Sequence, residues 1–286
     1  MPPLVSVIIP TYNRTPMLLR ALKSVLAQSH ARLEIIVVDD GSTDDPEPMI
    51  RSLNDPRILY LRQSQNRGAA AARNLGMRHA QGEQLMFLDS DDEFLPGRIG
   101  RLLEVFGSLA DRPGLIFTNA FEINVKGEKT FTVDPAHPSG YVTTDRRFPA
   151  SVFTPTSCWM ICRDAAQGEF FDEQIYTIED CDLFARIARK SPSYFLNEAL
   201  TLKHVHSDAQ GRVPLAHAEQ TRERMLSKWL PEMKKDRDFL VSFYCTMAKD
   251  LVRCGKKKKA IDILWKALSV APFNVKIVGK LFKAYA

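Results

Sequence analysis

Short apolar runs alternate along the chain with amphipathic stretches, and this alternation predicts strands separated by helices. The first run, Val5–Pro10, is rich in β-branched residues and ends in a proline, which is typical of a buried strand. Similar runs occupy residues 34–38, 58–61, 85–88, 115–118 and 196–205. Helical patterns occupy residues 17–27, 46–53, 98–109 and 183–190. The order predicts an α/β fold with a mostly parallel central sheet flanked by helices.

The chain after Pro214 changes character, because its pattern is helical throughout. We therefore predict two domains, an α/β domain of residues 1–213 and a helical C-terminal region of residues 214–286. Residues 239–254 and 259–270 are amphipathic and spaced as in a tetratricopeptide-like hairpin. One such hairpin cannot bury its own apolar face, so we expect it to pack on the first domain or on a partner.

Three carboxylates, Asp89, Asp91 and Asp92, follow directly on the buried run at residues 85–88. If the strand continues, Asp89 and Asp91 point the same way, into the crevice at the carboxyl edge of a parallel sheet. Carboxylate oxygens suit Mg²⁺ or Mn²⁺, which usually take one or two protein carboxylates and leave other positions to water and phosphates. The alternative is an acidic, solvated turn before the next helix.

Three further features have both a structural and a chemical interpretation. Arg73 follows a run of alanines whose helix can lie close to a ligand, but it could equally form an ordinary ion pair. Glu179 and Asp180 stand where acidic residues complement a helix dipole, which leaves open which of them faces a cleft. His204 and His206 share one face of a strand, although a lone histidine there is more often a core or surface residue.

Composition indicates an ordinary soluble globular protein, with 286 residues of which 45% are hydrophobic and 26% charged. No apolar run approaches the ~20 residues that span a bilayer, and no signal peptide is apparent, so we expect a cytoplasmic protein. The five cysteines have no Cys-x2-Cys spacing, which argues against a disulfide framework and a structural zinc site.

The loop after the first strand, Thr11–Arg14, excludes several nucleotide-binding classes. It lacks the Gly-x-Gly-x-x-Gly of dinucleotide folds and the Gly-Lys-Ser/Thr of P-loops, so a nicotinamide or flavin dehydrogenase is not expected. A nucleotidyltransferase would also need a Gly-rich, basic loop at this position, and none is present.

Taken in order, five motifs resemble those of the inverting family-two glycosyltransferases, which have the GT-A fold. They are Val-Ser-Val-Ile-Ile-Pro-Thr-Tyr-Asn from Val5, Val-Val-Asp-Asp-Gly-Ser-Thr-Asp from Val37, Asn-Arg-Gly…Ala-Arg-Asn from Asn66, Phe-Leu-Asp-Ser-Asp-Asp from Phe87, and Glu179-Asp180. The resemblance covers residues 5–207, so residues 1–213 are expected to be the catalytic domain.

The resemblance implies a binding site for a nucleoside-diphosphate sugar, with a UDP-sugar favoured. Pro10, Thr11, Tyr12 and Asp40 would hold the base, the aspartate by accepting a hydrogen bond from a ring N–H. Arg73 would order the nucleotide end of the cleft.

The resemblance also implies the catalytic residues and the metal. Asp91 would bind Mn²⁺ or Mg²⁺ at the diphosphate, Asp89 would reach the ribose and the metal, and Asp92 is a substitute for either. Asp180 would be the catalytic base, and Glu179 would orient the acceptor or brace its loop. One displacement by an acceptor hydroxyl then inverts the anomeric centre.

His206 resembles a histidine that many relatives place near the metal, but Lys203 and His204 depart from the Tyr-Arg-x-His pattern that often surrounds it. The chain also lacks the Gln-x-x-Arg-Trp motif and membrane helices of processive polysaccharide synthases. The rival hypothesis is a catalytically silent scaffold that only binds a nucleotide sugar.

The charge is asymmetric, because the net charge of +5 combines +9 from residue 215 onward with −4 before it. A basic tail suggests contact with an anionic surface rather than with nucleic acid. We expect Lys256–Lys259 to be exposed and to offer peripheral contact with the inner face of a membrane, and the C-terminal helices to offer a homodimer interface. The donor partner is a nucleotide sugar, and the acceptor is a glycan, a lipid-linked molecule or a protein.

Overall fold

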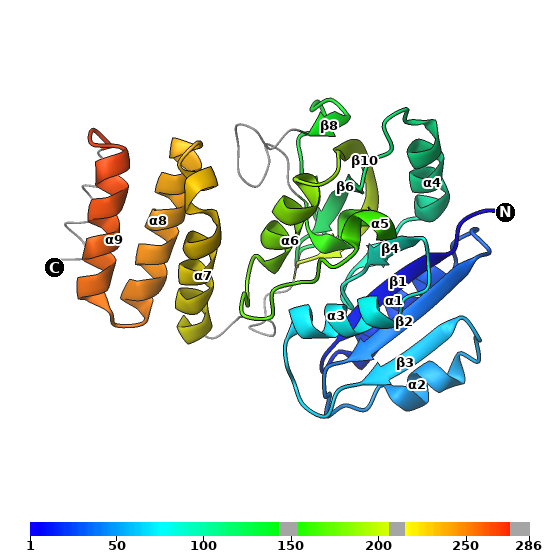
Figure 1. Cartoon of the computed structure of the whole chain (residues 1–286). Coiled ribbons are helices and arrows are strands. Elements are labelled where there is room, and N and C mark those ends of the chain that lie inside the picture. The colour runs from blue at the N-terminus through cyan, green and yellow to red at the C-terminus, as the bar shows by residue number, and fades with distance from the viewer. Residues whose placement is uncertain (143–153, 206–214, 275–286) are drawn as a thin grey trace.

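The computed structural model describes residues 1–142, 154–205 and 215–274, which form a central sheet, helices on its two faces and a helical C-terminal region (Figure 1). The strands run in the order β3-β2-β1-β4-β9-β6-β10-β5, with β7 paired to β6 and β8 paired to β10. Their bounds are β1 Val5–Thr11, β2 Leu33–Asp39, β3 Ile58–Arg62, β4 Gln84–Phe87, β5 Glu93–Phe94, β6 Leu115–Ile123, β7 Lys129–Phe131, β8 Gly140–Val142, β9 Trp159–Cys162 and β10 Ser193–His204.

The first four strands in this order are parallel, as β2 pairs with both β1 and β3 and β1 pairs with β4. The β9 strand is antiparallel to both β4 and β6, whereas β6 and β10 are parallel to each other. Because β1, β2 and β4 run in the same direction, their carboxyl ends lie at one edge of the sheet. The polar residues that follow these strands are therefore brought together.

Helices cover both faces of the sheet. Two apolar clusters carry this packing, one joining the sheet to α1, α2 and α4 and the other joining it to α3 and α6. Gly76 lets α3 approach β1 closely, because a Cβ atom there would lie 2.4 Å from Ile8 Cγ2. The bounds are α1 Thr15–Leu26, α2 Glu47–Ser52, α3 Ala69–His79, α4 Arg98–Ser108, α5 Arg163–Ala166 and α6 Glu179–Ala188, with a 3₁₀ turn at Thr156–Cys158.

The C-terminal region consists, in its described part, of α7 Leu215–Met233, α8 Arg237–Arg253 and α9 Lys257–Val270. The three helices lie side by side, with α6 between them and the sheet (Figure 1). Asp236 caps α8 by accepting a hydrogen bond from the N–H of Phe239 at 3.0 Å. The hairpin of α8 and α9 packs on α7, and Ile175 and Ala185 from the α/β part belong to the same apolar cluster as these helices.

One sequence expectation differs from the structure. The helix expected at residues 183–190 begins earlier, at Glu179, because Glu179, Asp180 and Asp182 satisfy its positive N-terminal end. The side chains of Lys256 and Lys259 are largely exposed, as expected, and they also pair with Glu219 on α7, at 2.5 Å and 2.6 Å. The helix packing brings the acidic residue of α7 next to the start of α9, which the local sequence does not reveal.

Candidate active site

A cleft of about 960 Å³ opens at the carboxyl ends of β1, β2 and β4. Most of the residues singled out in the sequence line it, although they come from five separate segments of the chain. These lining residues are Pro10, Thr11, Tyr12, Asp40, Arg73, Asp89, Asp91 and Glu179. Asp92 and Asp180 belong to the same segments but are not among the residues that line the cleft. His206 lies outside the described residues.

Asp40 is buried beneath one end of the cleft and is held by three hydrogen bonds. Its Oδ1 accepts from Gln63 Nε2 at 2.7 Å and from the N–H of Arg67 at 2.8 Å, and its Oδ2 accepts from the N–H of Gly68 at 2.8 Å. Burial raises the pKa of Asp40, while the two backbone N–H groups lower it. The Oδ2 atom keeps a free acceptor position, because a carboxylate oxygen can accept two hydrogen bonds.

The acidic segment after β4 is a turn, which corrects the expectation that the strand continues and that Asp89 and Asp91 share one face of it. The β4 strand ends at Phe87, and the N–H of Asp92 donates to the carbonyl of Asp89 at 2.9 Å. Strand pairing ends here, because β9 pairs only with residues 84–86 on one side and the pairing with β1 on the other side ends at Phe87. Asp89 and Asp91 nevertheless both reach the cleft.

Each of the three carboxylates in this turn has a different environment. Asp91 pairs with Arg14 Nη1 at 2.5 Å, and Asp89 pairs with Arg73 Nη2 at 2.7 Å. Asp92 is 3% exposed, and burial together with the charges of Asp89 and Asp91 raises its pKa to about 8. Asp92 also accepts the N–H of His204 at 3.3 Å, so it braces the neighbouring strand rather than facing the cleft.

Arg73 is buried beneath the cleft and connects two of its walls. Its Nη1 donates to Glu179 and its Nη2 to Asp89, both at 2.7 Å. Burial disfavours the charged guanidinium, but the two carboxylates outweigh it and raise the pKa of Arg73 above its usual value. The ion-pair interpretation of Arg73 thus holds, and the pair lies inside the candidate site.

The α6 helix begins at Glu179, directly after a strained residue. Ile178 has φ 58° and ψ 24°, a left-handed conformation that is rare for β-branched residues and that is tolerated where packing imposes it. The Ile178 side chain packs against the apolar cluster of the C-terminal helices. That anchor fixes the direction in which Glu179 and Asp180 leave the turn.

Glu179 lines the cleft, whereas Asp180 is not among the lining residues; the residue as a whole is partly exposed, but its carboxyl group is buried. Burial of the carboxyl group and the adjacent charge of Glu179 raise the pKa of Asp180 to about 7, although Arg73 opposes the rise. A carboxylate with such a pKa can accept a proton near neutral pH, which is what a general base requires.

The donor set of the cleft fits a divalent cation that is completed by substrate. Within the described parts of the chain, no group of three or more His, Cys, Asp and Glu residues is arranged to hold a metal ion. Asp89 and Asp91, however, present two carboxylates to the cleft, and Mg²⁺ or Mn²⁺ is commonly bound by one or two carboxylates with phosphate and water. Arg14 and Arg73 pair with these two carboxylates from beside the cleft.

Several lining residues did not stand out in the sequence. Three of them, Arg14, Glu173 and Tyr176, lie close in the sequence to motifs that were recognised, and this proximity could have indicated that they belong to the cleft. His217 belongs to α7, 37 residues after Asp180, and no local pattern connects it with the cleft. Its ring stacks on that of Tyr176 with a centroid distance of 4.0 Å and an interplanar angle of 13°.

Residues 6–170 match the family model described as glycosyl transferase family 2. An uncharacterised glycosyltransferase of Rickettsia conorii is 38% identical over 190 residues, which cover 65% of this chain but only 30% of that relative. The GalNAc(5)-diNAcBac-PP-undecaprenol beta-1,3-glucosyltransferase of Campylobacter jejuni is 29% identical over 293 residues, covering 94% of this chain and 89% of the relative.

Among solved structures, residues 1–349 of S. aureus TarS in complex with UDP-GlcNAc superpose with a TM-score of 0.69 at 19% identity. The match covers 94% of this chain and 82% of that chain. At this level of identity the similarity concerns the fold.

Proposed function

Because this chain belongs to glycosyl transferase family 2 and has the GT-A type of fold, we propose that it transfers a sugar from a nucleoside-diphosphate sugar to an acceptor hydroxyl. One observation carries the proposal: Asp40, Asp89, Asp91 and Glu179, from four different segments, line one cleft of about 960 Å³. A cleft of this volume is within the range that holds a ligand as large as a nucleotide sugar.

The donor occupies the end of the cleft between β1 and the start of α3. Pro10, Thr11 and Tyr12 would contact the base, and the free acceptor position of Asp40 Oδ2 would receive a ring N–H. A UDP-sugar is the favoured donor, and the TarS complex with UDP-GlcNAc provides a precedent in the same fold.

Asp91 would hold a Mn²⁺ or Mg²⁺ ion at the diphosphate, with Asp89 as the second carboxylate and His206 as a further ligand. Such an ion supplies Lewis-acid stabilisation of the leaving diphosphate. The Arg14 guanidinium, paired with Asp91, is positioned to stay near the same phosphates and add positive charge there.

The reaction is a single displacement at the anomeric carbon. Asp180 accepts the proton of the acceptor hydroxyl as its oxygen forms the new glycosidic bond, and the bond to the diphosphate breaks on the opposite face. One base and one displacement invert the anomeric configuration without a covalent sugar–enzyme intermediate. Glu179 is kept by Arg73 in a supporting position next to the base.

The cellular role that we propose is the synthesis of a cell-surface polysaccharide or glycoconjugate, which the name of the Campylobacter relative supports. A catalytically silent scaffold is the alternative, and it differs in one measurable respect: a scaffold binds the nucleotide sugar without consuming it.

The test begins with the purified chain, a panel of nucleotide sugars and calorimetric titration, followed by measurement of nucleoside-diphosphate release. We expect UDP-sugar binding and release to need Mn²⁺ or Mg²⁺ and to collapse in Asp91→Asn. Asp262→Asn, on the exposed face of α9, is the matched control and should behave as wild type. Binding without turnover would favour the scaffold hypothesis. Full turnover in excess chelator would contradict the proposed requirement for a metal ion.

Within the described residues, no helix is long and apolar enough to cross a membrane.

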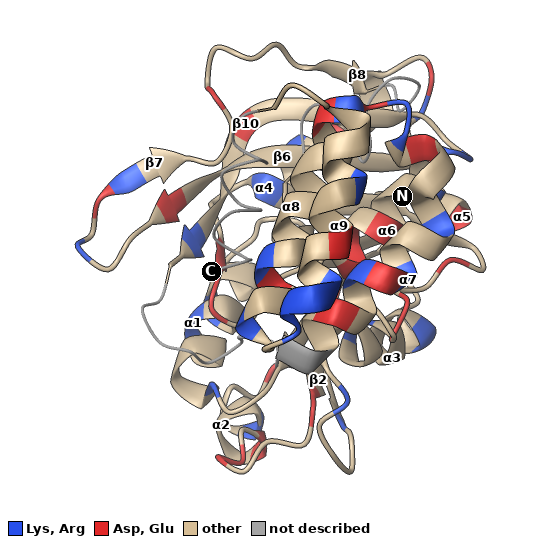
Figure 2. Cartoon of the chain, turned by 90° about the vertical axis from the view of Figure 1, so that its left-hand side faces the viewer, with Lys and Arg blue, Asp and Glu red and all other residues tan. Residues whose placement is uncertain are grey.

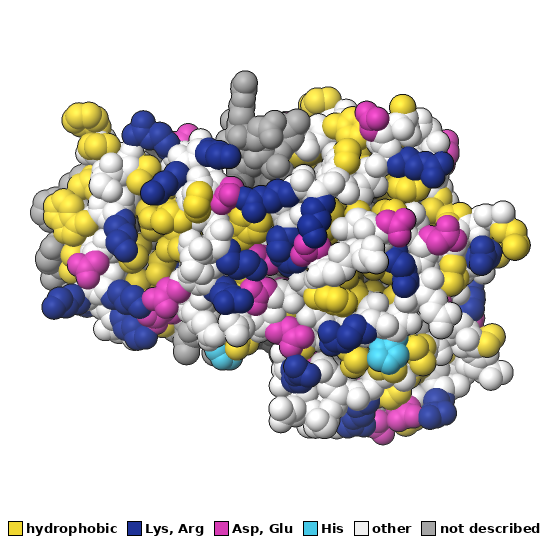
Figure 3. All heavy atoms as spheres, viewed as in Figure 1, with side chains coloured by type: hydrophobic (Ala, Val, Ile, Leu, Met, Phe, Trp, Pro, Cys, Tyr) yellow, Lys and Arg dark blue, Asp and Glu magenta, His cyan; other side chains and the backbone are white. Residues whose placement is uncertain are grey.

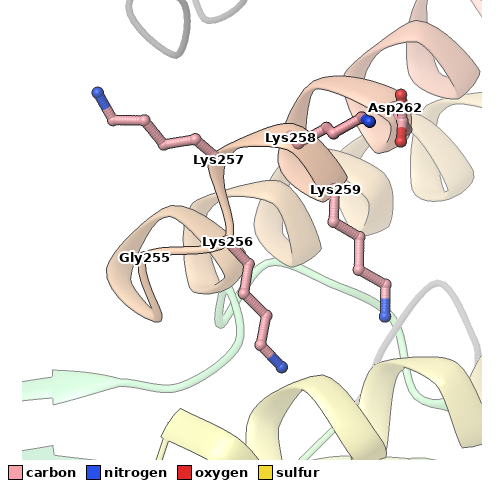
Figure 4. A pocket seen from close by; sticks show the side chains of 6 residues that line it. All are labelled: Gly255, Lys256, Lys257, Lys258, Lys259 and Asp262. Carbon is pink, nitrogen blue, oxygen red and sulfur yellow. The ribbon is translucent and has the colours of Figure 1, made fainter.

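We further propose a cytoplasmic protein that touches the inner face of the membrane through the start of α9. Figure 4 shows Lys256 and Lys259 pointing one way, towards α7, and Lys257 pointing away from them. Lys257 and Lys258 are exposed and form no ion pair with any residue that the structure describes.

The view onto the C-terminal helices shows Lys and Arg gathered at the start of α9 (Figure 2). The same helices expose apolar side chains on their outer side (Figure 3). Trp265 is 52% and Phe273 is 96% exposed. Exposed aromatic and basic residues together suit a membrane surface. The alternative proposal is that the same surface of the C-terminal helices forms a homodimer interface.

A further inference from the structure

We propose that the stacked rings of Tyr176 and His217 form the binding platform for a sugar ring of the acceptor, which makes the acceptor a saccharide. The proposal rests on the proposed function and deepens it. It starts from the fact that both residues line the same cleft as Glu179, although His217 comes from the C-terminal helical region.

The α7 helix is fixed to the segment before the candidate base by buried polar contacts. Thr221 is fully buried, and its Oγ1 accepts the N–H of Tyr176 at 2.9 Å. Trp229 Nε1 and Lys228 Nζ both contact the buried Asp182, at 2.8 Å and 2.7 Å. These contacts hold α7 against α6 and the Tyr176 segment, so His217 has a defined place at the cleft.

Asp172, at the start of the same segment, strengthens this attachment. It pairs with Arg224 at 2.9 Å and with Lys228 at 3.0 Å. Burial alone would raise the pKa of the Asp172 carboxyl group, but the hydrogen bonds from Lys228, the N–H of Gln174 and Arg224 outweigh it and lower the pKa, so the group stays ionised at neutral pH. The C-terminal region is therefore part of the cleft wall and is not a separate appendage.

The place of the pair in the cleft favours the acceptor over the donor. Tyr176 lies three residues before Glu179 on the turn that leads into α6, next to the carboxylates that would receive the acceptor hydroxyl. The proposed donor contacts come instead from residues 10–12, Asp40 and the turn at Asp89 and Asp91. A nucleophile must approach the anomeric carbon from the side of the base, and Tyr176 and His217 line the same cleft as Glu179, the chain neighbour of that base.

The chemistry of the two rings suits a pyranose. Stacking at a centroid distance of 4.0 Å covers one face of each ring, so a sugar can pack only on an outer ring face, with the Tyr176 hydroxyl and the His217 ring nitrogens as polar groups at its rim. The C–H face of a pyranose packs on such a surface while its hydroxyls hydrogen-bond to the polar groups. Neither ring is fully buried, so the pair remains accessible from the cleft.

The experiment measures saccharide binding directly, by saturation-transfer NMR on the full chain with UDP and Mn²⁺ present. The probes are the methyl β-glycosides of glucose, galactose, N-acetylglucosamine and N-acetylgalactosamine, with glycerol as an acceptor that has no ring. We expect saturation transfer to the ring C–H protons of at least one glycoside and none to glycerol. In Tyr176→Leu and His217→Leu the transfer should fall at least about tenfold, whereas Tyr176→Phe and His217→Phe should retain most of it.

The controls separate this proposal from the proposed function. His79→Leu, on α3 and outside the set of cleft-lining residues, should leave glycoside binding as in wild type. UDP affinity, measured by calorimetry, should change less than twofold in the leucine variants. An equal loss of UDP affinity would assign the rings to the donor, and glycosides that never bind would overturn the saccharide platform. A wild-type chain that fails to bind any nucleotide sugar would instead contradict the proposed function.

Discussion

Arg73 and Glu179 are 106 residues apart in the chain and form an ion pair of 2.7 Å beneath the cleft. The same guanidinium holds Asp89 at 2.7 Å, so one side chain joins the turn after β4 to the start of α6. The buried arginine therefore helps to fix the position of the proposed metal-binding turn relative to the proposed base. Arginine suits this role because its planar fork donates in two directions at once.

The first prediction is that Arg73→Lys lowers both stability and transfer. A lysine ammonium can reach one of the two carboxylates but cannot span both, which leaves the other partly buried without its partner. We expect the free energy of unfolding to fall by about 1–3 kcal/mol, measured by denaturant titration. Arg51→Lys alters an exposed ion pair with Glu47 and should change stability by less than about 1 kcal/mol. Equal effects of the two substitutions would contradict the bridging role.

The second prediction concerns the adjacent carboxylates of α6. Asp180→Asn keeps the shape of the side chain but cannot accept a proton, so donor affinity should survive while the transfer rate falls about 10²–10⁴-fold. Glu179→Gln weakens the ion pair with Arg73 and should lower stability, with a smaller loss of rate. Turnover measured with both variants decides the assignment, which would be reversed if Glu179→Gln lost transfer and Asp180→Asn retained it.

The third prediction is a pH dependence that follows from the pKa of Asp180, about 7 in the folded protein. A base must be ionised, so kcat/KM should fall about tenfold per pH unit below about pH 7. The folded state binds a proton that the unfolded state, with a carboxyl pKa of 3.8, has already released. The stability contributed by this group is therefore present at low pH and is lost as the pH rises through about 7.

Asp180→Asn tests this sign independently of activity. The substitution removes the ionisation, so the melting temperature of the variant should rise relative to wild type at pH 8 and differ little at pH 4. A variant that is less stable than wild type at pH 8 would show that the ionised carboxylate stabilises the fold.

The fourth prediction concerns the membrane. Replacing Lys257 and Lys258 by glutamine should weaken binding to vesicles that contain anionic lipid by roughly 30-fold, because each basic residue near such a surface contributes about 1 kcal/mol. Lys234 and Lys235 are also exposed, follow α7 and form the matched double substitution. If both double variants co-sediment with the vesicles to the same extent, the proposed membrane contact at α9 is contradicted.

The strands and their terminal carboxylates followed from the sequence because both are local properties. A run of β-branched residues such as Val5–Ile9 specifies a buried strand by itself, and residues 34–38 do the same. Since the carboxyl ends of parallel strands meet at one edge, the cleft position of Asp40 and Asp89 could be predicted before any coordinates. The order of the motifs was sufficient to recognise the family.

Only the tertiary structure decided which distant side chains meet. The choice of Asp89 and Glu179 as partners of Arg73 depends on how closely α3 packs on β1 and where α6 begins. The place of His217 in the cleft depends on the buried contacts of α7 with Tyr176 and Asp182. Strand and helix periodicity fixes which face of an element is apolar, but the position of one element against another is set by packing of the whole core, which no local stretch encodes.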